Sequence, residues 1–260
     1  DYSSLRSFDP NNEAQLFTPR DGRWYMQKRS MGGGKKAAQG DGFYVADNPP
    51  YGVEFTYYLK EGYKSKEALR KKQESKTEKD GGTVATPEWA VLEDEKNELK
   101  PNVWLFIYDN SGNVVRKVKA GNSKGFNRVS WDLKKDAMMT LSKDNYTRGG
   151  TGYMLGPGTY KAQLHKQLEG SYTAIGEQVS FEVKPFMNSA DGSAPDQVIA
   201  HWSKVSAMQI KANELRTDLR DTEKNIDVLL KAYDRATGTD AAMHSKILEL
   251  RTSVLDLKLK

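Results

Sequence analysis

Carboxylate side chains are the groups in this chain that could catalyse hydrolysis. Glycoside hydrolysis needs two carboxylates about 5–10 Å apart across a cleft. The residues of the right type are Asp109, Asp132, Asp136 and Glu54. Asp109 begins a turn, and Glu54 lies on an exposed strand face. Asp132 shares a strand face with Arg128 and can pair with it. We therefore predict no catalytic residue in this segment.

Metal and cofactor chemistry also lacks support. Cysteine is absent, and His165, His201 and His244 are not at metal-ligand spacing. The glycine-rich residues 31–36 lack the spacing of a phosphate-binding loop. Residues 109–113 resemble the first half of a calcium loop but lack the later bidentate glutamate. We predict no cofactor and no metal site.

Aromatic side chains could instead form a binding surface. Trp104 and Trp131 lie within expected strands, so we predict that both belong to the core. Other aromatics lie in an expected loop at 134–155 or in short apolar pieces near the start of the chain. The candidate surface contacts are Trp24, Tyr25, Tyr146 and Tyr153.

Composition restricts the class of protein. The 260 residues are 37% hydrophobic with a mean hydropathy of −0.76, and no apolar run approaches the roughly 20 residues that span a bilayer. The net charge is +5, but 40 basic residues are interleaved with 35 acidic ones and no nucleic-acid-binding motif accompanies them. Nucleic acid is therefore not an expected partner. Since Asp1 follows no initiator methionine or signal peptide, we expect a segment of a longer protein.

The first hundred residues combine loops with a few regular elements. Turn signals predict an irregular, extended docking segment over 1–50. Residues 51–100 are expected to hold a strand at 51–61 and charged helices. The first helix begins after an N-cap at Ser65, and the second begins after a cap at Thr86.

The remainder divides into a strand-rich part and a helical part. Short alternating strands predict an immunoglobulin-like β-sandwich over 101–187. Apolar residues then recur at intervals of three and four, which predicts a helical hairpin over 194–260 with antiparallel helices. The expected fold class is α+β: a docking segment, a sandwich and a helical hairpin.

The most distinctive segment spans residues 48–61, where a two-proline turn leads into an aromatic strand. Its motif residues are Asn48, Pro49, Pro50, Tyr51, Gly52, Phe55, Tyr57 and Tyr58. The segment resembles one that follows the last blade in secreted β-propeller proteins of the sortilin-like, BNR-repeat type. Residues 103–133 and 156–160 are similar to an immunoglobulin-like module also seen in flagellar hook-cap proteins.

This resemblance covers almost the whole chain and implies the C-terminal region of such a protein, without its propeller. Any catalytic carboxylates of the glycoside-hydrolase-like relatives would belong to the propeller. We therefore expect a non-catalytic, protein-interaction region of an exported protein from a Gram-negative bacterium, located in the periplasm, on the outer surface or secreted. Its expected partners are the propeller of the same parent chain and a cell-envelope assembly.

Two other functions stay open at this point. The chain could be part of a hydrolase whose catalytic residues lie in the missing propeller, or a carbohydrate-binding module that uses the 134–155 loop. Membrane contact ranks below protein contact, because the basic residues of the helical tail form no concentrated face.

Overall fold

The computed structural model describes residues 3–27, 42, 46, 48–137, 150–186, 195–238 and 240–259. The chain is α+β and separates into two compact units, described here one at a time. One unit comprises Asp1–Asp136 and Met154–Pro195, and the other comprises Ala137–Tyr153 and Asp196–Lys260.

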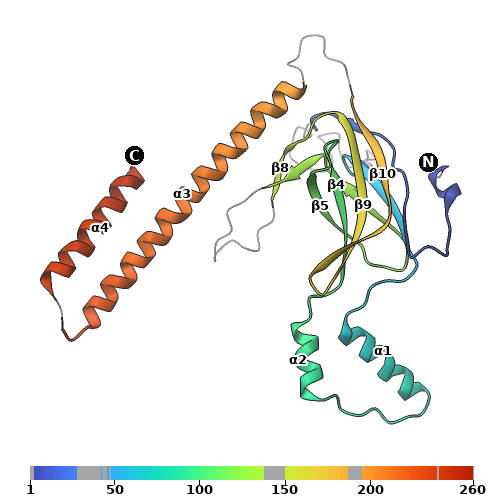
Figure 1. Cartoon of the computed structure of the whole chain (residues 1–260), viewed down its shortest axis with the longest axis horizontal. Helices are drawn as coiled ribbons and strands as arrows, with labels where there is room; N and C mark the ends of the chain where they lie inside the picture. Colours follow the sequence, from blue (N-terminus) through green and yellow to red (C-terminus); the bar gives the residue numbers. More distant parts are fainter. Residues whose placement is uncertain are drawn as a thin grey trace. The chain divides into compact units, whose positions relative to one another are not determined.

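The first unit is a β-sandwich of two sheets (Figure 1). The three-stranded antiparallel sheet has the order β1 (Ala14–Leu16), β3 (Val53–Leu59), β6 (Gly125–Trp131). The five-stranded sheet has the order β2 (Gly22–Trp24), β10 (Ser171–Pro185), β9 (Gly158–Leu168), β4 (Asn102–Tyr108), β5 (Val114–Ala120). A 3-10 helix η1 (Ser3–Ser7) precedes them, and β7 (Lys134–Asp136) and β8 (Thr151–Met154) are shorter strands. The first two strands join different sheets, because β1 pairs with β3 and β2 pairs with β10.

The sandwich includes more of the chain than the range 101–187 that we predicted for it. β1 and β2 come from the segment 1–50, which is therefore not irregular throughout, and β3 comes from the range 51–100. β1 and β2 have three residues each. Such short strands show no usable alternation in sequence, so only their pairing in the tertiary structure defines them.

The core lies between the two sheets. Val53, Phe55 and Tyr57 share the buried face of β3, as their alternation predicts. The ring of Phe55 lies 5.1 Å from that of Phe181 across the sandwich. The Tyr57 hydroxyl donates to the Gly121 carbonyl at 2.6 Å, and burial raises the pKa of Tyr57 to about 12. These aromatic contacts link the two sheets.

The two strand tryptophans differ in position. Trp131 is 1% exposed, which confirms the prediction that it belongs to the core. Trp104 is only half-buried, because Val103 and Leu105 occupy the inward positions on either side of it. Its indole nitrogen donates to Gln167 Oε1 at 2.8 Å on the outer face of the sheet. The prediction that Trp104 is a core residue is wrong.

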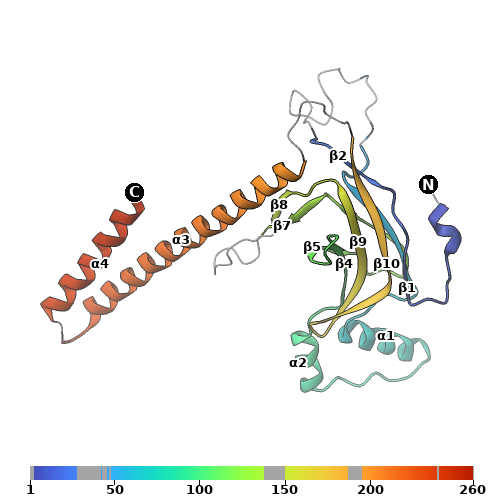
Figure 2. The same cartoon turned by 45° about the horizontal axis from the view of Figure 1, so that its top comes forward.

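Two helices, α1 (Lys66–Lys79) and α2 (Trp89–Asn97), lie between β3 and β4 in the chain and at one end of the sandwich (Figure 2). Ser65 caps α1 as predicted, with its Oγ accepting from the Ala68 amide at 3.3 Å. α2 begins at Trp89 with Glu88 as its N-cap, so the expected cap at Thr86 is wrong. Arg70 joins the helices through a bidentate pair with Glu95 at 2.6 and 2.8 Å.

The second unit contains the helical hairpin of α3 (Pro195–Arg235) and α4 (Ala241–Leu259). Asp240 caps α4 by accepting from the Ala242 amide at 2.9 Å. Ile226 of α3 packs with Ile247 and Val254 of α4, and all three are buried. Among the helices described, none is long and apolar enough to cross a membrane.

An imidazole is buried on the outer face of the five-stranded sheet. His165 stacks on Phe106 with ring centroids 4.1 Å apart, while Lys117 and Tyr172 cover the same phenyl ring. Nδ1 of His165 has no hydrogen-bond partner among the residues described. Burial, followed by the charge of Lys117, lowers the pKa of His165 below its ordinary value of 6.5.

This burial makes the stability of the sandwich pH-dependent. The unfolded chain binds the His165 proton at a higher pH than the folded chain, so stability is full above pH 6.5 and falls as the pH drops below it. We expect His165→Phe to flatten this dependence in urea denaturation midpoints measured on both sides of pH 6.5. An equally steep loss of stability in the variant would contradict the assignment.

Candidate binding cleft

A cleft of about 2110 Å³ lies along the segment that connects β1 to β2. Pairing of this segment with β3 ends where the Phe17 amide donates to the Thr56 carbonyl at 3.1 Å. Pro19 has no amide hydrogen to continue the ladder, and the chain then crosses to pair with β10. The crossing leaves adjacent edges of β3 and β10 uncovered, and these edges form the cleft walls.

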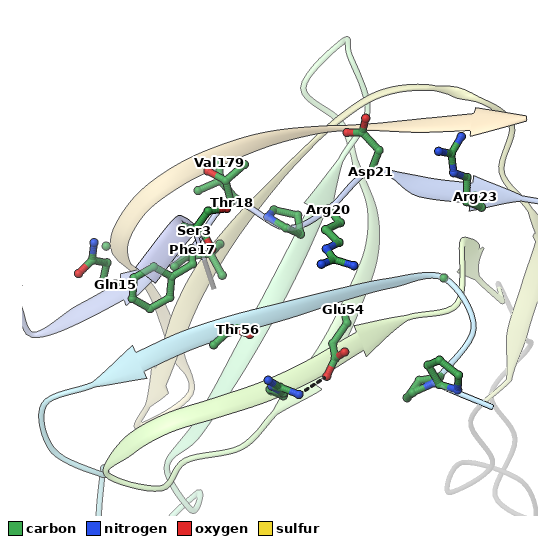
Figure 3. Close-up of a pocket in the computed structure, with 18 of the residues that line it drawn as sticks. Ser3, Gln15, Phe17, Thr18, Arg20, Asp21, Arg23, Glu54, Thr56 and Val179 are labelled. Atoms are coloured by element: carbon green, nitrogen blue, oxygen red, sulfur yellow. Dashed lines mark hydrogen bonds and ion pairs between the residues drawn. The ribbon is translucent and has the colours of Figure 1, made fainter. Parts of the chain in front are cut away.

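The cleft walls carry both signs of charge. Arg20 extends toward β3, whereas the Glu54 carboxylate points toward Arg128 of β6 (Figure 3). Arg128 pairs with Glu54 at 3.4 Å. Asp21 Oδ2 accepts from Lys184 Nζ at 2.6 Å, and this hydrogen bond holds the pKa of Asp21 below its ordinary value. Alternating charges of this kind suit a mixed-charge protein surface better than a polyanion.

An aromatic cluster forms one end of the cleft. Tyr25 contacts Tyr51 edge-to-face at a ring distance of 5.0 Å and Phe186 at 5.6 Å. The Tyr51 hydroxyl donates to the Tyr25 carbonyl at 2.7 Å, and the Phe186 amide donates to the Trp24 carbonyl at 3.0 Å. Tyr25 is 41% exposed and Phe186 63% exposed. We call Tyr25, Tyr51 and Phe186 the aromatic cluster.

The predicted surface contacts fall in different environments. Tyr25 belongs to the aromatic cluster. Trp24 lies next to it and is half-buried, because its indole nitrogen donates to the Leu155 carbonyl at 2.8 Å. Tyr153 is a half-buried residue of β8. Tyr146 lies outside the residues that the structure describes.

Some residues of the two-proline motif line the cleft, and others pack within the sandwich. Asn48, Pro49 and Pro50 are exposed and line the cleft. Gly52 has a φ of +106°, and an added Cβ would lie 1.9 Å from the Trp131 carbonyl oxygen. Tyr58 points to the opposite face of β3 from the core, where it contacts Phe8, with ring centroids 4.7 Å apart.

Each carboxylate considered for catalysis has a local partner. Asp109 Oδ1 accepts from the Asn113 amide at 2.8 Å and closes a turn. Asp136 pairs with Arg116 at 2.9 Å. Asp132 Oδ1 accepts from the Lys134 amide at 3.2 Å.

The expected pairing of Asp132 with Arg128 is wrong, since Arg128 pairs with Glu54 on the neighbouring strand β3. Within the described parts of the chain, no group of three potential metal ligands gathers.

Sequence reasoning missed Phe186 and the charged residues between β1 and β2. In the sequence, Arg20 and Asp21 belong to a segment with the composition of a turn. That segment lines the cleft only because the chain crosses there from one sheet to the other. Phe186 follows β10 directly, so its exposure depends on where β10 ends. A solitary phenylalanine after a strand gives no sequence signal of this kind.

Comparisons with known proteins add little to this geometry. No protein-family model matches the chain, and no curated protein matches it. FlgD from P. aeruginosa, a solved structure, is similar over 30% of this chain and 50% of that chain, at 25% sequence identity. The TM-score is 0.19, which is below the level at which two folds are alike. The matched part of this chain spans half the length of that FlgD chain.

Proposed function

We propose that this chain is a non-catalytic, protein-interaction region of a large exported bacterial propeller protein of the sortilin-like, BNR-repeat type. Its partners are the propeller of the same parent chain and a protein assembly of the cell envelope or surface. The observation that carries the proposal is the aromatic cluster of Tyr25, Tyr51 and Phe186 at the end of a large cleft.

The chemistry of this surface suits a protein partner. Aromatic side chains are enriched at the centres of protein interfaces, where they bury much area with few rotatable bonds. The Tyr51 hydroxyl hydrogen-bonds to the backbone of Tyr25, so the position of the exposed Tyr25 ring is restricted before any partner binds. Little side-chain freedom is then lost on binding, which favours affinity.

The proposal predicts that truncating the cluster strongly weakens partner binding. In pull-downs from cell-envelope fractions of the source bacterium, we expect Tyr25→Ala with Phe186→Ala to reduce partner retention by about thirtyfold or more, as for interface hot spots. Tyr172→Ala is the matched control, because Tyr172 is 43% exposed on the outer face of the five-stranded sheet. It is expected to retain the partners fully.

Three results would contradict this function. If the double variant and the control retained the partners equally, the aromatic cluster would not be part of the interface. Turnover of a glycan or peptide by the purified chain, lost in Asp132→Asn, would favour a hydrolase instead. Retention of glycans without proteins, lost in the double variant, would favour a carbohydrate-binding module.

A further inference from the structure

The helix α3 carries two apolar stripes, each repeating every seven residues. The first stripe is Val205, Ala212, Leu219, Ile226 and Tyr233. The second stripe is Met208, Leu215, Thr222 and Leu229. Their offset of three and four residues gives the pattern by which helices pack in coiled coils and bundles, where both stripes are buried.

The helix α4 buries part of the first stripe and leaves the second stripe exposed. α3 has 41 residues and α4 has 19, and α4 runs beside the C-terminal half of α3 (Figures 1 and 2). Ile226 is 4% exposed, whereas Met208 is 68%, Leu215 64% and Leu229 51% exposed. α4 matches this, since Met243, Leu250 and Leu257, also seven residues apart, are 57–59% exposed. The hairpin thus resembles a helix bundle that lacks a member.

The charges beside the stripes indicate what completes the bundle. Two α3 helices in antiparallel register, with Ala212 opposite Leu215 of the second copy, place Lys211 beside Asp218 of the second copy. The two-fold symmetry forms this pair twice. In a parallel register, Lys211 would instead face Arg216, and Asp218 would face Glu223, both like-charged pairs. The sequence of α3 therefore favours an antiparallel second copy.

The lengths of the helices agree with this arrangement. Residues 195–218 of α3 extend beyond α4 by about 36 Å at 1.5 Å per residue. α4 itself spans about 28 Å by the same measure. In the antiparallel register, Val198 and Val205 of one copy lie along Leu229 and Thr222 of the other. Each uncovered half of α3 can therefore complete the hairpin of the other copy as its third helix.

We infer that this chain forms an antiparallel homodimer through the second stripe of α3, the part of the first stripe that α4 leaves uncovered, and the matching exposed stripe of α4. This surface belongs to the helical hairpin and shares no residue with the aromatic cluster. The dimer can accordingly be tested without the partner proteins of the cleft.

Sedimentation of the full chain tests the dimer directly. We expect a dimer that Leu215→Lys converts to a monomer, with the dissociation constant raised about 100-fold or more, because a charge enters the interface centre. Val228→Lys is the matched control, since Val228 is also 64% exposed on α3 but lies outside both stripes. It should remain a dimer. A monomeric wild-type chain, or equal effects of the two variants, would overturn the inference.

Charge exchange and cross-linking test the orientation. Lys211→Asp or Asp218→Lys alone should weaken the dimer about tenfold, and the double exchange should restore it. Because the chain has no cysteine, Thr222→Cys with Val205→Cys should form an intermolecular disulfide. Thr222→Cys alone should not, since Thr222 lies away from the two-fold axis and meets its own copy only in a parallel dimer. Cross-linking of that single variant would overturn the antiparallel arrangement.

Discussion

Replacing Gly52 with alanine is expected to destabilise the sandwich by about 3 kcal/mol or more. The φ of Gly52 is +106°, and a Cβ there would lie 1.9 Å from the carbonyl oxygen of Trp131. The atoms that the Cβ would meet are the backbone oxygen and carbon of the Trp131 carbonyl, which cannot rotate away as a side chain can. β3 can therefore relieve the clash only by moving away from β6, with which it pairs along its length. The free energy of unfolding from urea denaturation measures the effect.

A second glycine separates the steric clash from the backbone conformation. Gly112 has a φ of +84°, but an added Cβ would meet no atom within 4 Å. Gly112→Ala should therefore cost only the roughly 1 kcal/mol of a left-handed non-glycine residue. Similar losses for the two variants would show that the close approach to Trp131 does not constrain β3.

The Trp131→Ala variant is expected to lose about 4 kcal/mol of folding free energy. Trp131 is 1% exposed and lies edge-to-face with Tyr160 at 5.2 Å and with Phe181 at 6.0 Å. Its indole nitrogen also donates to the Lys134 carbonyl at 2.9 Å. Removal of the ring leaves a cavity between the sheets and an unpaired carbonyl.

The same substitution at an exposed site provides the control. Trp89 of α2 is 79% exposed, so Trp89→Ala should change the free energy of unfolding by no more than about 0.5 kcal/mol. Thermal or urea unfolding of both variants gives the comparison. Comparable losses would mean that Trp131 is not central to the core.

Strong local patterns predicted most of the elements. Alternation placed Val53, Phe55 and Tyr57 on the buried face of β3, and Ser65 was recognisable as a helix cap. The three- and four-residue spacing of 195–259 predicted both helices of the hairpin. These features depend on neighbours within a few residues, and the sequence order specifies such neighbours directly.

The cleft depended on contacts between distant residues. Trp104 was predicted to be a core residue because it lies within an expected strand, but which face of β4 is buried depends on the sheet that packs against it. Tyr25, Tyr51 and Phe186 come from three separated segments and meet only because β2 pairs with the end of β10.

The sequence by itself therefore determined the longer strands and the helices, because these follow from short-range sterics and periodicity. The tertiary structure decided which strand edges stay uncovered, and with them the position of the cleft. That outcome depends on long-range pairing between β1, β2, β3 and β10, for which no local pattern of residues is a sufficient cause.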